Sequence, residues 1–128
     1  FMFEDWQCRM GATLWEDLDG YIANSPLLFA DKIHTPVLIF HCDQDEAVSF
    51  YDGRNLFLAL RRLQRPVWML NYMGQGHFLT SRPAEVDWTI RLQQFFDHYL
   101  KDIPMPRWMK EGININERGM DQKYDLVR

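Results

Sequence analysis

A short apolar run that stops abruptly at an acidic loop constrains the fold of this chain more than any other feature. Residues 36–40 open with proline and continue as apolar residues with a β-branched bias, and Asp43, Asp45 and Glu46 follow. A continuous apolar run of this length is typical of a strand buried on both faces. Proline is tolerated at the first position of such a strand. We therefore predict a buried strand whose carboxyl end carries acidic side chains.

A second unit with the same layout follows along the chain. Residues 66–72 again open with proline and continue as a mainly apolar run, and two glycines break the pattern just before His77. Helical periodicity covers residues 50–63 and the stretch from 83 to about 100. Two strands, each followed by a helix, predict an α/β fold with a parallel sheet and right-handed crossovers.

Asp45 and His77 are candidates for two members of a Ser-His-Asp triad, because both follow strands of the predicted parallel sheet. In this interpretation Asp45 accepts a hydrogen bond from one imidazole nitrogen and fixes the tautomer, while the other nitrogen acts as general base. In the alternative interpretation Asp43 and Asp45 are solvated loop acids and His77 is an ordinary loop histidine. Spacing alone does not separate the two.

No residue of the chain is an evident nucleophile. The serines are Ser25, Ser49 and Ser81, and none stands in the Gly-x-Ser-x-Gly pattern of a nucleophile elbow. Ser49 is better explained as a helix cap, and Cys42 as a small buried thiol after a strand. In α/β-hydrolases the triad runs Ser, Asp, His along the chain. The serine would then precede Phe1, so we expect this chain to be part of a longer protein.

The composition excludes several functional classes. A hydrophobic content of 47% and an aromatic content of 15% predict a folded globule, and a net charge of −4 argues against a nucleic-acid partner. The two cysteines lack zinc-type spacing, and no apolar run approaches the roughly 18 residues of a membrane span. A crowded set of metal-ligating side chains lies in one short stretch, but it fits no EF-hand pattern: His41, Asp43, Asp45 and Glu46. We expect no metal and no cofactor.

The sequence patterns at the two ends of the chain are less regular. Residues 1–20 are expected to form a loop and a short helix around Leu14 to Leu18, and residues 26–32 a helical turn that leads into the first strand. The tail from about residue 103 looks extended. His34 and His98 have no partner in sequence and are expected to be surface or structural histidines.

Several motifs together resemble the carboxyl-terminal end of the prolyl oligopeptidase family of serine peptidases. The His-Gly-x-x-Asp-x-x-Val signature of that family reads His41-Cys42-x-x-Asp45-x-x-Val48 here, with cysteine in place of glycine. The resemblance selects Asp45 rather than Asp43 as the triad acid and His77 as the base. Its other segments are Ala23-Asn24-Ser25-Pro26-Leu27, Leu60-Arg61-Arg62-Leu63, Pro66-Val67, Gly76-His77 and Trp108-Met109-x-x-Gly112.

The resemblance implies that residues 1–128 are the C-terminal half of an α/β-hydrolase domain, a parallel sheet flanked by helices. It implies a serine-type peptidase acting on oligopeptides, as a dipeptidyl or acylaminoacyl peptidase, and a fragment that is inactive without the serine-bearing part of the same protein. An esterase-type hydrolase and a non-catalytic interaction module are the alternatives. Half a sheet leaves an exposed edge and an uncovered apolar face, so we expect a homo-oligomer. No compartment is predicted.

Overall fold

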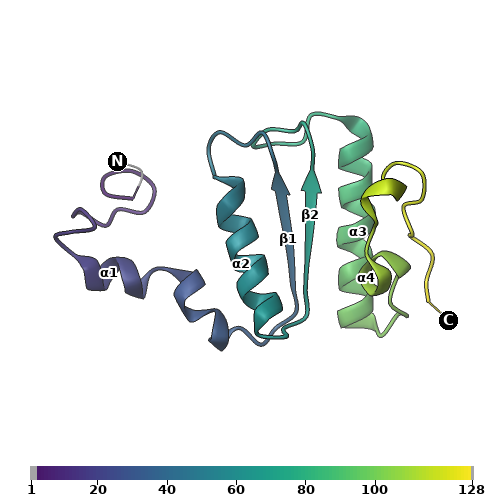
Figure 1. Ribbon diagram of the computed structural model, residues 1–128, viewed down its shortest axis with the longest axis horizontal. Helices are drawn as coiled ribbons and strands as arrows, with labels where there is room; N and C mark the ends of the chain where they lie inside the picture. The colour runs from purple at the N-terminus through teal and green to yellow at the C-terminus, as the bar shows by residue number, and fades with distance from the viewer. Residues whose placement is uncertain (1–2, 128) are drawn as a thin grey trace.

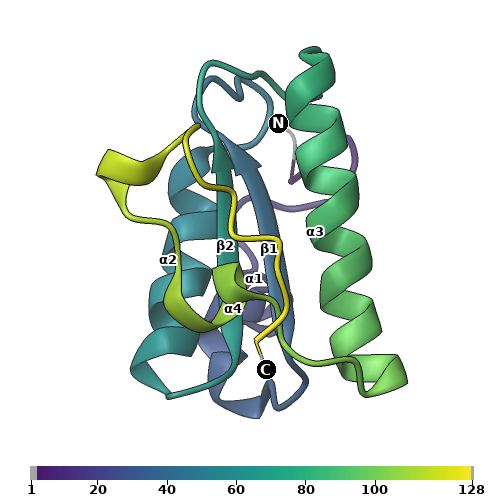
Figure 2. The ribbon, with the colours of Figure 1, turned by 90° about the vertical axis from the view of Figure 1, so that its right-hand side faces the viewer.

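The structure, a computed structural model, describes residues 3–127. A two-stranded sheet lies between two long helices, α2 on one side and α3 on the other (Figures 1 and 2). The amino-terminal segment lies beyond α2, and the carboxyl-terminal tail passes in front of the sheet in Figure 2. The elements are α1 (Leu18–Ala23), η1 (Pro26–Lys32), β1 (Val37–Cys42), α2 (Phe50–Arg62), β2 (Val67–Tyr72), α3 (Arg82–Lys101), α4 (Arg107–Glu111) and η2 (Ile115–Glu117).

The two strands are parallel and end at the same level. Val37 is paired with Val67 at one end of the sheet, and Cys42 with Tyr72 at the other. The predicted α/β fold with a parallel sheet is confirmed, and both strands follow the apolar runs that predicted them. Because the strands end in register, the loops that follow them leave the same edge of the sheet side by side (Figure 1).

Each helix covers one apolar face. On the α2 side, Leu60 is fully buried against Ala30 of η1 and Val67 of β2. On the α3 side, Phe95 forms a second cluster with two aromatic or apolar side chains of the tail, Trp108 and Met109. The hydroxyl of Ser49 accepts a hydrogen bond from the Tyr51 N–H, which confirms its role as the cap of α2. Within residues 3–127 no helix is both long and apolar enough to cross a membrane.

The first helix lies later in the chain than predicted. We expected a helix around Leu14 to Leu18, whereas α1 begins at Leu18 and ends at Ala23. The Asp17 side chain accepts a hydrogen bond from the Gly20 N–H and caps the helix at that point. A capping carboxylate fixes a helix start more strongly than the scattered apolar residues before it. The helical turn at residues 26–32 is confirmed.

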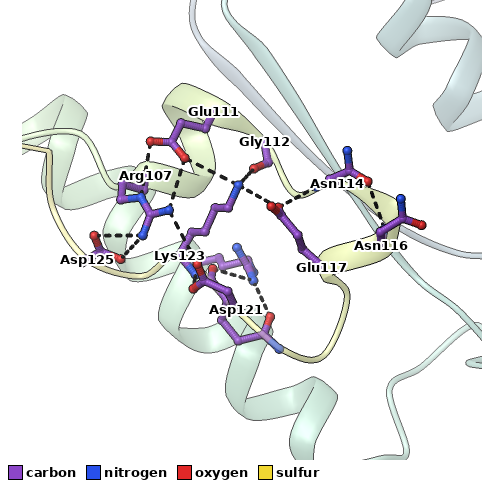
Figure 3. Close-up of polar contacts among 11 residues, drawn as sticks. Arg107, Glu111, Gly112, Asn114, Asn116, Glu117, Asp121, Lys123 and Asp125 are labelled. Atoms are coloured by element: carbon purple, nitrogen blue, oxygen red, sulfur yellow. Dashed lines mark hydrogen bonds and ion pairs between the residues drawn. The ribbon is translucent and has the colours of Figure 1, made fainter.

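The tail is not simply extended, which corrects the expectation for residues after 103. It contains α4 and η2, and it folds back so that Pro106 and Leu126 form an antiparallel bridge. Figure 3 shows the ionic contacts that close this turn. The Lys123 ammonium lies 2.9 Å from a carboxylate oxygen of Glu117 and 3.5 Å from one of Glu111. These contacts form only when the tail folds back on itself, so local composition did not indicate them.

A buried polar network attaches the tail to α3. The Arg91 guanidinium is only 2% exposed and donates two hydrogen bonds, of 2.8 and 2.9 Å, to the Asp87 carboxylate. The same carboxylate accepts hydrogen bonds from the hydroxyls of Tyr72, at the end of β2, and Tyr124, in the tail. Burial, followed by the Asp87 carboxylate, raises the pKa of Tyr124 to about 12, so its hydroxyl stays a donor at neutral pH. One aspartate thus joins β2, α3 and the tail.

Candidate active site

The loop after β1, residues 43–49, is the acid loop, and its geometry is set by Asp45. The Oδ1 atom of Asp45 accepts hydrogen bonds from the backbone N–H groups of Ala47, at 2.9 Å, and Val48, at 2.8 Å. Such a bond pattern is the way an aspartate side chain stabilises a local turn. The Asp45 side chain is only 8% exposed. The Asp-x-x-Val spacing therefore corresponds to a turn that holds this carboxylate in place.

The loop after β2, residues 73–81, is the histidine loop. Gly74 has a φ of +73°, a conformation that residues with a side chain rarely adopt. The Gln75 side-chain oxygen then accepts hydrogen bonds from the backbone N–H groups of Thr80, at 2.9 Å, and Ser81, at 3.0 Å. This side chain ties the beginning of the loop to its end. His77 lies between the two, and its side chain is 46% exposed.

The structure brings Asp45 and His77 together. The Nδ1 atom of His77 lies 3.0 Å from Oδ2 of Asp45 and 3.2 Å from Oδ1. Since an ionised carboxylate only accepts hydrogen bonds, Nδ1 is the protonated nitrogen in this contact. Nε2 has no hydrogen-bond partner within residues 3–127. The imidazole therefore presents an available acceptor on the side away from Asp45.

The environment of Asp45 favours its charged form. The hydrogen bond from the Val48 N–H, together with those from His77 and Ala47, lowers the pKa of the Asp45 carboxyl despite partial desolvation, which acts in the opposite direction. An acid that orients an imidazole must stay ionised while the imidazole gains a proton. The turn of the acid loop supplies that property.

The serines of the chain have structural contacts. The Ser25 hydroxyl donates a hydrogen bond to the carbonyl of Tyr21, Ser49 caps α2, and Ser81 precedes α3 at its N-cap position. In the part of the chain that the structure describes, none of them is hydrogen-bonded to His77.

Cys42 is the buried thiol that the sequence predicts, with 1% exposure. Burial, followed by the charges of Asp45 and Asp43, raises the pKa of this thiol, which disfavours the nucleophilic thiolate. Cys42 replaces the glycine of the family signature. As the last residue of β1 it does not adopt a left-handed φ, so the backbone there does not require glycine.

The other histidines have structural surroundings or lie at the surface. His41 is 7% exposed, and its Nδ1 accepts a hydrogen bond from the Cys42 N–H while its ring packs edge-on against Phe50. His98 donates from Nδ1 to the carbonyl of Ile103 at the end of α3, and His34 is exposed. Across residues 3–127, no three histidine, cysteine or carboxylate side chains are arranged to share a metal ion.

Two further contacts between the loops were not predicted from the sequence. The Gly74 N–H donates to Oδ1 of Asp43 at 2.6 Å, and the Gln44 N–H donates to the carbonyl of Gln75 at 3.1 Å. Both join the acid loop to the histidine loop beside the Asp45–His77 contact. Asp43 differs from an ordinary loop acid only through this contact, which no local sequence pattern reveals.

A parallel sheet that delivers a carboxylate and an imidazole to one edge is the arrangement of an α/β-hydrolase-type protein. The comparisons with known proteins agree with this class. The family model described as the prolyl oligopeptidase family matches residues 1–102. The chain belongs to the prolyl oligopeptidase family.

Individual relatives show how much of such a protein the chain represents. It is 32% identical over 103 residues to Dipeptidyl-peptidase 5 of Porphyromonas endodontalis, a match that covers 77% of this chain and 15% of that relative. It is 26% identical over 103 residues to the Uncharacterized peptidase YuxL of Bacillus subtilis, covering 78% of this chain and 15% of the relative. The Acylamino-acid-releasing enzyme of Rattus norvegicus is 30% identical over 80 residues, or 62% of this chain and 10% of the relative. The chain thus spans about 15% of the length of the first two relatives.

Proposed function

We propose that this chain supplies the acid and the base of a Ser-His-Asp triad in a serine-type peptidase. Asp45 is the acid, His77 is the base, and the serine comes from a part of the same protein outside these residues. The observation that carries the proposal is the 3.0 Å contact between Asp45 Oδ2 and His77 Nδ1, with Nε2 left available. Membership of a peptidase family and relatives named as peptidases support it.

The chemistry follows from the two ring nitrogens. A serine hydroxyl beside Nε2 attacks the scissile carbonyl while Nε2 takes its proton, and the same proton then passes to the leaving amine. Asp45 keeps Nδ1 protonated, so that Nε2 is the acceptor, and it stabilises the imidazolium during the reaction. Within residues 3–127 no serine is hydrogen-bonded to His77, so we expect the chain alone to be inactive. Loss of the nucleophile in such triads lowers kcat by about a million-fold.

The proposed substrates are oligopeptides. The relatives are named as a dipeptidyl-peptidase and an acylamino-acid-releasing enzyme, and both names describe release of a short unit, a dipeptide or an acylated amino acid. We extend this substrate class to the protein that contains this chain. An esterase would use the same acid and base, and the family match is what favours the peptidase.

A fluorophosphonate probe on the whole protein tests the proposal. We expect the probe to label one serine, and His77→Ala to abolish the labelling because the serine loses its base. His34→Ala is the matched control, since His34 is exposed and lies outside both loops. Absence of labelling in the whole protein would favour the interaction module. Labelling that persists in His77→Ala would show that His77 is not the base of the triad.

A substrate comparison separates the peptidase from the esterase. The whole protein is assayed with dipeptidyl and N-acylaminoacyl p-nitroanilides and with p-nitrophenyl esters. An amide is cleaved only if its leaving nitrogen is protonated, and His77 can deliver that proton. We therefore expect the amides to be cleaved. Hydrolysis of the esters alone would assign the protein to the esterases.

A further inference from the structure

We propose that Asp43 is a positioning residue that fixes the histidine loop to the acid loop and so aligns His77 with Asp45. The inference rests on the proposed function for its catalytic meaning, but the alignment itself can be measured without activity. Asp43 comes two residues before Asp45, so the same short segment carries the orienting acid and this second carboxylate. The two carboxylates have different partners: Asp45 faces His77, and Asp43 faces the backbone of Gly74.

The histidine loop is braced internally, so it is expected to shift as a unit. The Gln75 side-chain oxygen accepts from the N–H groups of Thr80 and Ser81, which joins the beginning of the loop to the start of α3. His77 lies inside the segment closed by these bonds. A displacement of Gln75 would therefore carry His77 with it.

The point at which this braced unit is attached to the acid loop is Gly74 and Gln75. The Gly74 N–H donates to the Asp43 carboxylate at 2.6 Å, and the Gln75 carbonyl accepts from the Gln44 N–H at 3.1 Å. Hydrogen bonds to an ionised acceptor are shorter and roughly twice as strong as neutral ones. The Asp43 bond is thus the stronger of the two backbone attachments, and its removal leaves one neutral bond beside the Asp45–His77 contact.

Alignment at this scale matters for catalysis. A misplacement of about 1 Å at a reacting group can lower the rate about a hundredfold. His77 is half-exposed, and the ring that packs edge-on against it, that of Phe78, is itself 75% exposed. The backbone attachment through Asp43 therefore adds a constraint that this exposed ring contact does not provide.

The test uses three variants of the acid loop. Asp43→Ala removes the acceptor, while Asp43→Asn keeps an oxygen acceptor and removes only the charge. Glu46→Ala is the control, because Glu46 is exposed and forms no hydrogen bond with any residue in the range 3–127. If Asp43→Ala does not fold, Asp43→Ser replaces it with the same expectation, since its shorter side chain leaves the acceptor position empty.

Two NMR measurements on the whole protein report the attachment and its effect. Amide exchange with ¹⁵N-glycine labelling follows the Gly74 N–H. Ring ¹⁵N shifts with labelled histidine give the tautomer of neutral His77, with exposed His34 as internal reference. In the wild type we expect a protected Gly74 amide and a His77 ring protonated mainly at Nδ1.

Asp43→Ala is expected to speed Gly74 exchange about tenfold or more, the value for loss of a hydrogen bond to a charged group. It is also expected to move the His77 tautomer ratio toward that of His34. Glu46→Ala should keep the wild-type tautomer ratio, and Asp43→Asn, which keeps a weaker neutral acceptor, should fall between the wild type and Asp43→Ala. An unchanged His77 tautomer in Asp43→Ala, whatever happens at Gly74, overturns the positioning role.

The whole protein supplies the catalytic readout. We expect Asp43→Ala to lower kcat about ten- to a hundredfold with little change in KM, and Asp43→Asn to restore most of it. A kcat unaffected by Asp43→Ala contradicts the proposal. A wild-type protein without peptidase activity instead contradicts the proposed function, and the His77 tautomer then still decides whether Asp43 aligns the pair.

Discussion

Asp45→Asn is expected to inactivate the protein while leaving the acid loop folded. In the wild type, Oδ1 of Asp45 accepts from the N–H groups of Ala47 and Val48, and Oδ2 faces Nδ1 of His77. An asparagine keeps the two backbone bonds only if its oxygen takes the Oδ1 position. Its NH₂ group then faces His77, and a donor facing Nδ1 forces the ring proton onto Nε2.

The size of the effect follows from that tautomer. Nε2 can no longer take the proton of a serine, and enforcing the wrong tautomer in a Ser-His-Asp triad lowers kcat about 10⁴-fold. At 1.36 kcal/mol per factor of ten, this is about 5.5 kcal/mol of lost transition-state stabilisation. The two backbone bonds remain, so the free energy of unfolding should change by less than about 1 kcal/mol.

The assay pairs kcat on a p-nitroanilide peptide with urea unfolding of the same whole-protein samples. Asp45→Ala is the matched variant, because it removes the acceptor for Ala47 and Val48 as well. We expect it to lose activity and also about 2 kcal/mol of stability. The reasoning is refuted if Asp45→Asn keeps kcat within about tenfold of the wild type, or if it unfolds as readily as Asp45→Ala.

Three further predictions concern stability and assembly. Asp87→Ala removes the only carboxylate paired with the buried Arg91 guanidinium within residues 3–127 and leaves it the hydrogen bonds to Gln122; it should cost about 3–5 kcal/mol of unfolding free energy in urea. Glu85→Ala, which breaks an exposed pair with Arg82, should cost less than about 1 kcal/mol. Burial acts to raise the pKa of Asp87, but hydrogen bonds from Arg91, Tyr124 and Tyr72 outweigh it and lower the pKa below its ordinary value. The stability from this carboxylate is therefore present at neutral pH and lost as the pH falls through the acid range, and urea midpoints measured across that range should fall less steeply in Asp87→Asn. Within the described residues β1 pairs on one side only, so the isolated chain should self-associate; a strictly monomeric species in light scattering at high concentration would contradict this.

The sequence predicted those parts of the fold that depend on local patterns. The apolar runs gave both strands, and helical periodicity gave α2 and α3. The parallel topology then predicted that Asp45 and His77 leave the same edge of the sheet, and they are found 3.0 Å apart. Their catalytic role stays a prediction.

The parts that the sequence did not predict depend on contacts that form only when the chain folds back on itself. The turns of the tail are closed by Lys123 with Glu111 and Glu117, and by the bridge from Pro106 to Leu126. The hydrogen bond between Asp43 and Gly74 joins residues that are 31 positions apart in sequence. Side chains of these types are ordinary surface residues in any local window, so only the folded arrangement assigns them a role.

The matched ends of the two strands carry a consequence for how this chain tolerates changes in length. One residue added within β1 or β2 would move its loop tip by about 3.3 Å and turn the following side chains to the opposite face. A 3.0 Å contact between loop tips cannot survive such a shift. Extra residues in the turn between α2 and β2, at the far end of the sheet, would leave it intact. Natural variation and engineered insertions should therefore collect at that turn and avoid the strands.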